Sequence, residues 1–284
     1  MNINYILYNE FCPHPTFEKN VEDILHQHLL IRGFLYDRNK TGVFFNSISE
    51  VYEDMRNYIN LPHVLWLYFT SSGILKPNIN RHKLTDSTYG IYAGLDLPIW
   101  LNDPSTATKR IMVIGQDPRR NDKEMQNNPD CITLSTPFGF HSYSWRISNK
   151  GLIHQVFVDI INNYYQNNGS NLCVYFTDFF KFRKAEGTKS KIDSFNKDVY
   201  FDTLSCEICN FQPDIIIPVG CKTASAIMRK KIGWRECFKR QTIGAYTYFP
   251  ILHVSGANNG YIQKVKPAGN NICIFFVDII SRNL

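Results

Sequence analysis

The chain has 284 residues, of which 44% are hydrophobic and 14% aromatic, and its formal net charge is +6. This amount of apolar material is enough to bury a sizeable core, which excludes extensive disorder. The sequence has no run long and apolar enough to cross a membrane, and residues 1–10 carry no positively charged leader, so we expect a cytoplasmic protein without a membrane partner.

Residues 1–95 are predicted to be mostly helical. Apolar side chains recur at helical spacing over residues 17–30 and again over residues 47–66. Neither stretch contains residues that indicate a particular chemistry. We therefore expect residues 1–95 to form a helical N-terminal segment that packs against a main domain of residues 96–284.

From about residue 109, short apolar runs alternate with longer amphipathic stretches. The short runs are typical of buried strands and cover residues 111–114, 172–176, 215–219 and 246–252. The amphipathic stretches are typical of helices and cover residues from about 148 to 161, from about 192 to 211, a short segment from about 221, and 272 to 280. This alternation predicts an α/β fold, specifically a three-layer α/β/α arrangement around a central four-stranded parallel sheet.

Ligands of such sheets bind outside the carboxyl ends of the strands. The loops after Ile114, Phe176 and Leu252 are therefore expected to meet at one edge. The first loop places a carboxylate, Asp117, between Gly115 and a proline, and the last begins with His253. Each side chain has a plain structural interpretation, because Asp117 could cap a turn and His253 could be a buried turn histidine.

Taken together, the strand ends resemble those of the uracil-DNA glycosylase superfamily. Gly-Gln-Asp-Pro at residues 115–118 is similar to its first motif, and His-Val-Ser at 253–255 is similar to its His-Pro-Ser, with Val254 in place of proline. The resemblance covers about residues 109–284. It implies a metal-free and cofactor-free hydrolase in which Asp117 acts on water and the sugar cation, while His253 stabilises the departing base.

The resemblance also implies which residues read the base. Asp178 occupies the place of an asparagine that reads the base edge, and Arg119 replaces a tyrosine that excludes substituents at the pyrimidine five-position. An ionised Asp178 can only accept hydrogen bonds, which favours the exocyclic amine of cytosine over uracil; as a helix cap it would instead point away. The remaining candidates for base recognition are Gln116 and, as stacking residues, Leu134, Phe138 and Phe140.

These departures favour a 5-modified cytosine, and one branch of the superfamily excises glucosylated hydroxymethylcytosine from phage DNA as antiviral defence. The resemblance equally admits a uracil-excising repair enzyme. A non-catalytic DNA-binding protein on the same fold is the rival from another class.

DNA is the expected partner, held through basic and polar residues near the predicted mouth of the site. Lysine and arginine side chains would contact phosphates and make binding sensitive to salt, although a solvated loop has the same composition. The candidates are Arg120, Lys181, Arg183 and Lys184, with Ser255, Asn258 and Tyr261 after the histidine.

The eight cysteines do not indicate a metal site. Cys206 and Cys209 form a single C-x-x-C within a predicted helix, and no second pair stands at zinc-ribbon spacing. We expect buried free thiols, and no iron–sulfur ligand pattern of the superfamily is present.

Overall fold

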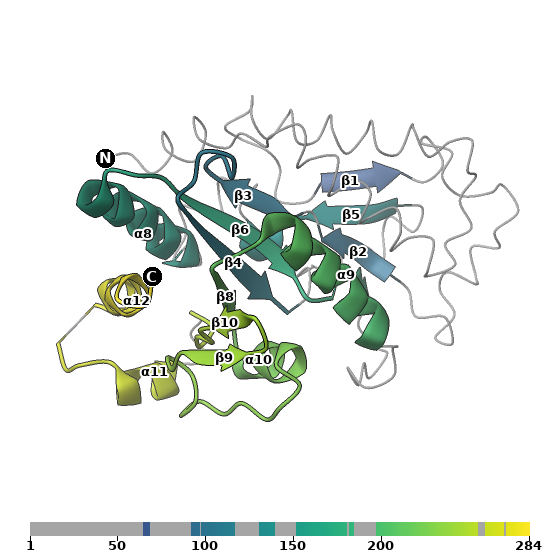
Figure 1. The fold of residues 1–284 in the computed structure, drawn as a ribbon. Coiled ribbons are helices and arrows are strands. Elements are labelled where there is room, and N and C mark those ends of the chain that lie inside the picture. The colour runs from purple at the N-terminus through teal and green to yellow at the C-terminus, as the bar shows by residue number, and fades with distance from the viewer. Residues whose placement is uncertain are drawn as a thin grey trace, which may run out of the picture.

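The computed structural model describes residues 65–68, 92–96, 98–116, 131–139, 152–180, 182–184, 197–254, 259–269 and 271–284. Its main sheet has six strands in the order β3-β6-β4-β8-β10-β9 (Figure 1). The strands are β3 (Ile99–Leu101), β4 (Lys109–Gly115), β6 (Leu172–Asp178), β8 (Ile215–Pro218), β9 (Gln241–Ile243) and β10 (Tyr246–Tyr248).

The sheet is mixed and larger than the sequence predicts. β4 pairs in parallel with β6 and β8, and β8 pairs in parallel with β10. The edge strands β3 and β9 pair antiparallel with β6 and β10. The prediction of a purely parallel four-stranded sheet was therefore incomplete, because two strands of only three residues each extend its edges.

Five helices accompany the sheet in the described residues: α8 (Leu152–Asn168), α9 (Lys197–Phe211), α10 (Cys221–Ile227), α11 (Asn259–Val265) and α12 (Ile272–Ser281). Successive side chains of a strand point to opposite faces. On β6, the Phe176 ring lies 5.1 Å from Phe157 of α8, whereas the Tyr175 ring lies 5.1 Å from Phe211 of α9. α8 and α9 therefore cover opposite faces of β6.

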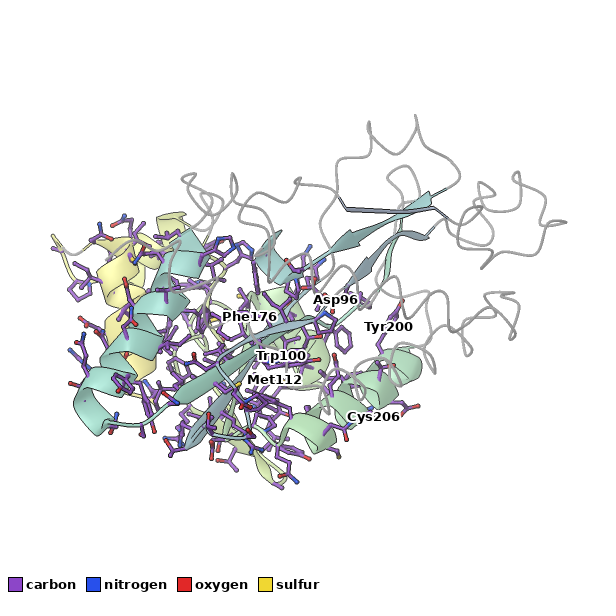
Figure 2. All side chains as sticks on the ribbon, turned by 90° about the horizontal axis from the view of Figure 1, so that it is seen from above. Asp96, Trp100, Met112, Phe176, Tyr200 and Cys206 are labelled. Carbon is purple, nitrogen blue, oxygen red and sulfur yellow. The ribbon has the colours of Figure 1, made fainter. Side chains whose placement is uncertain are left out.

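Apolar runs explain why the central strands form. All seven residues of β6 and all four of β8 are buried, as expected for parallel strands covered on both sides. Figure 2 shows Trp100, Met112 and Phe176 among densely packed side chains, whereas Cys206 lies on α9 toward the outside. The core thus fixes the strand ends, where the predicted site lies.

A second sheet of four strands has the order β1-β5-β2-β7. Its strands are β1 (Leu65–Tyr68), β5 (Cys131–Ser135), β2 (Tyr92–Asp96) and β7 (Phe182–Lys184). The predicted division at residue 95 falls inside β2, and the predicted helix over 47–66 ends inside β1. The helix predicted over 17–30 lies outside the described residues.

The strands and helices predicted from residue 109 onward are confirmed as β4, α8, β6, α9, β8, α10, β10 and α12, with shifted ends. β10 stops at Tyr248, and the chain continues to an isolated parallel bridge between Ile251 and Val219. None of the helices in the described ranges is long and apolar enough to cross a membrane.

Candidate functional site

The carboxyl ends of β4 and β6 lie side by side in register. Gly115 is the parallel partner of Asp178, the last residue of β6. The pairing continues past the strands, because the amide of Phe179 donates to the carbonyl of Gly115 and that of Phe180 donates to the carbonyl of Gln116, both at 3.0 Å. The first and middle predicted loops therefore leave the sheet together.

Gly115 is required for a close approach rather than for an unusual turn. Its φ is not positive, but a Cβ atom at this position would overlap Oδ1 of Asp178 and lie 3.3 Å from Cζ of Phe138. The Asp178 side chain is buried and occupies the space that a side chain at 115 would take. Asp178 is followed by β7, so it does not cap a helix, and the alternative interpretation of this residue as a cap is wrong.

Phe138 has a left-handed backbone, with φ 57° and ψ 11°. This conformation costs a residue other than glycine about 1–3 kcal/mol, so the surroundings must hold it. Nε2 of the fully buried His154 on α8 donates to the carbonyl oxygen of Phe138 at 2.8 Å, and the amide of Gly139 donates to Thr136 at 3.0 Å. The backbone is therefore fixed from the side of α8.

His253 reaches the Phe138 ring from the chain that follows β10. The amide of Gly220 donates to the carbonyl of Ile251 at 2.8 Å, which keeps the end of β8 beside the chain after β10. Gly220 has φ 95°, and a Cβ there would lie 4.0 Å from Cβ of His253. The rings of His253 and Phe138 have centroids 6.1 Å apart at an interplanar angle of 49°.

A buried carboxylate holds the end of β6 from the second sheet. Oδ2 of Asp96, the last residue of β2, accepts from the amide of Asp178 at 2.9 Å and lies 3.1 Å from the Thr177 hydroxyl. Asp96 has no exposed surface, and Figure 2 shows it near the middle of the molecule. Asp96 therefore couples β2 to the strand end that carries Asp178.

Glu207 of α9 is a second buried carboxyl group that contacts β6 near the same strand end. Its Oε1 accepts from the hydroxyl of Tyr175 at 2.9 Å and lies 2.8 Å from the Thr177 hydroxyl. The Thr177 hydroxyl has one proton and therefore donates to one of the two neighbouring carboxyl groups at a time. Both carboxyl groups are buried, and this is why hydrogen bonds around them are needed.

Three of the predicted site residues are brought together, namely Phe138, Asp178 and His253. Gln116 lies at the same strand end. Tyr261 lies on α11, with its ring 5.7 Å from that of Trp234. The backbones of Leu134, Arg183 and Lys184 lie in β5 and β7. The predicted residues outside the described part are Asp117, Arg119, Arg120, Phe140, Lys181, Ser255 and Asn258.

The structure adds Asp96, His154 and Glu207 to the surroundings of the site. Glu207 could have been found, because it lies four residues from both Thr203 and Phe211 and all three face inward from α9. Asp96 and His154 gave no such signal, since their partners are 82 and 16 residues away in sequence.

The cysteines also differ from the prediction. Cys206 and Cys209 are free, but both are exposed rather than buried, because they lie on the outer side of α9. In the described part of the chain, no group of three or more histidine, cysteine or acidic residues is placed to hold a metal ion.

No protein-family model matches the chain, and no curated protein matches it.

Proposed function

We propose that the protein is a DNA glycosylase that hydrolyses the bond between a flipped-out base and its sugar. The observation that carries the proposal is the position of Phe138, whose ring lies beside both the Gly115–Asp178 strand ends and His253. An aromatic face, a carboxylate and a hydrogen-bond donor are the groups that hold an extruded base by stacking and by its edge. We also propose that β6, β4, β8 and β10 form the middle layer of a three-layer α/β/α fold.

In the reaction, the base stacks on Phe138 and its edge donates to the carboxylate of Asp178. The bond between the sugar C1′ and the base nitrogen breaks, and its electron pair leaves with the base. His253 donates a hydrogen bond to the base oxygen on which negative charge grows. Water then adds its oxygen to C1′, and its released proton balances the charge of the departing base.

The sequence motif assigns the water to Asp117, two residues after Gly115. Its negative charge would also favour the positive charge that develops on the sugar. Asp117 lies outside the described ranges.

The proposed substrate is a 5-modified cytosine. A carboxylate at Asp178 accepts from the cytosine N4 amine, whereas it would face the O4 oxygen of uracil with repulsion. The sequence has Arg119 where the superfamily has a wall tyrosine, so it lacks the residue that would exclude a five-position substituent, and the arginine donors would suit a hydroxylated or glucosylated group.

The test incubates the protein with DNA that contains uracil, cytosine, 5-hydroxymethylcytosine or its glucosides, followed by mass spectrometry of released base. The proposal expects release from modified cytosine, and loss of release in Asp117→Asn with DNA binding retained. Efficient release of uracil alone would favour the repair enzyme. Binding without release from any substrate would favour the non-catalytic DNA-binding protein.

A further inference from the structure

The positive charge of the chain is concentrated in one segment. Residues 222–266 contain one acidic residue, Glu236, and nine basic residues. Of the 31 basic and 25 acidic residues in the whole chain, this leaves 22 and 24 for the remainder, so the net positive charge arises entirely from this segment. The nine are Lys222, Arg229, Lys230, Lys231, Arg235, Lys239, Arg240, Lys264 and Lys266.

The segment exposes these charges. Every one of the nine basic residues except Lys266 is exposed. Oε2 of Glu236 accepts from the amide of Gly233 at 2.8 Å, so the one carboxylate is used to hold the local turn. The segment therefore carries exposed positive charge and only one carboxylate of its own.

Two aromatic side chains of this segment, Trp234 and Tyr261, lie beside two of its basic residues. The Trp234 and Tyr261 rings have centroids 5.7 Å apart at an interplanar angle of 32°, and Tyr261 is 43% exposed. Nζ of Lys264 lies 5.5 Å from each ring centroid, and the Arg235 guanidinium lies 5.2 Å from that of Trp234. These four residues, here called the aromatic–basic surface, come from α11 and from the connection between α10 and β9.

We propose that the aromatic–basic surface binds an unpaired strand of DNA, with a base stacked on Tyr261 and phosphates held by Arg235 and Lys264. Exposed ring faces can stack only on unpaired bases, and interleaved cations match a phosphate backbone. The surface offers aromatic rings set among charges rather than a continuous apolar face, which favours a nucleic acid over a lipid membrane.

The surface is also connected to the candidate site. Tyr261 follows His253 by eight residues, so even a fully extended chain would keep the two within about 29 Å. A strand with one base in the site could therefore pass over the surface. The identity of the partner as DNA rests on the proposed function, whereas binding of an unpaired strand can be measured without any base release.

The experiment measures fluorescence anisotropy of a short labelled oligothymidylate over a range of salt concentrations. Tyr261→Ala should weaken binding roughly 5- to 150-fold, the range for losing one stacked base, while Tyr261→Phe should bind as the unaltered protein does. Arg235→Gln with Lys264→Gln should flatten the slope of log affinity against log salt by about 1.4, the value for two phosphate contacts on a single strand.

The matched control is Lys109→Gln with Arg282→Gln, which removes the same charge outside the basic segment. Lys109 begins β4, at the end of that strand away from Gly115. Equal weakening by both pairs of substitutions would overturn the proposal. Unchanged strand binding by the Tyr261→Ala variant would also overturn it, provided that this variant unfolds at the same temperature as the unaltered protein. The Tyr261→Ala substitution could weaken binding to duplex DNA, or to phosphatidylglycerol vesicles, as much as it weakens binding to the oligothymidylate. That result would overturn the choice of an unpaired strand.

Failure of this proposal differs from failure of the proposed function. If the surface variants bind normally and base release persists, the surface is not the strand path but the glycosylase stands. If the variants lose strand binding and no base is released from any DNA, the surface stands and the glycosylase does not.

Discussion

Gly115 and Asp178 face each other across the parallel pair β4–β6, and the carboxylate of Asp178 fills the space beside the glycine. The ends of β4 and β6 can therefore pair closely only because residue 115 has no Cβ in the space that the Asp178 carboxylate occupies. A glycine at 115 is therefore required for the Asp178 side chain to keep its position.

Gly115→Ala should destabilise the fold by about 1–3 kcal/mol, because the new methyl group meets Oδ1 of Asp178 in a packed interior. Adding Asp178→Ala should recover part of the loss, since it removes the overlapping carboxylate. Chemical denaturation of both single variants and the double variant measures this coupling. Gly260→Ala is the control, because nothing lies within 4 Å of a Cβ there; additive single effects would contradict the prediction.

Asp96→Ala should cost more stability than Asp96→Asn. Alanine leaves the buried amide of Asp178 without its acceptor, a loss of about 1–3 kcal/mol, whereas asparagine keeps an oxygen in reach. Thermal unfolding compares the two. The same amide should exchange its hydrogen faster in Asp96→Ala, and an unchanged exchange rate would mean that this hydrogen bond does not hold the end of β6.

Cysteine reactivity should separate the exposed thiols from the half-buried Cys273 and the buried Cys173. Burial, followed by the nearby Asp159 carboxylate, raises the pKa of Cys273 from 9.0 to about 11, and burial also raises the pKa of Cys173. At pH 8, iodoacetamide should therefore modify Cys209 well before either of them, as peptide mass spectrometry would show.

The same shift at Cys273 predicts a pH dependence. Above pH 9 the unfolded chain loses this proton while the folded chain keeps it until about pH 11, so folding stability should fall across that window. Cys273→Ser should lessen the fall, and an identical pH profile would contradict the prediction.

The sequence predicted the central strands because their apolar runs are continuous, but it could not predict the edges. β3 has three residues and β9 contains only one apolar side chain, so neither produces a recognisable period. In the site, strand order alone indicated that Asp178 and His253 share an edge. Their link through Phe138 depends on a left-handed backbone and on His154, which no local pattern reveals.

His253→Ala should lower the rate of base release by about 10²–10³-fold, the effect of removing one donor from developing negative charge. DNA affinity should be nearly unchanged, because the donor acts in the transition state. Single-turnover release and anisotropy measure the two quantities separately. A loss confined to thermal stability would identify His253 as a structural residue packed on Phe138.

Asp178→Asn should shift the choice of base toward uracil. The amide supplies both a donor and an acceptor, which match the O4 oxygen and the N3–H group of uracil, whereas the carboxylate accepts only. The size of asparagine is nearly that of aspartate, so the close approach to Gly115 is preserved. We expect the ratio of uracil release to modified-cytosine release to rise at least about tenfold, equivalent to about 1.4 kcal/mol, since one edge hydrogen bond changes from repulsive to favourable.

Asp178→Ala serves as the control for this shift, because it removes the edge contact without offering a new one. It should lower release of modified cytosine and relieve the repulsion of uracil, so the ratio should rise less than in Asp178→Asn. Competition between the two substrates in one reaction, read by mass spectrometry, gives the ratio directly. If Asp178→Asn and Asp178→Ala leave the ratio equally unchanged, Asp178 does not read the base, and its close contact with Gly115 serves only to join β4 to β6.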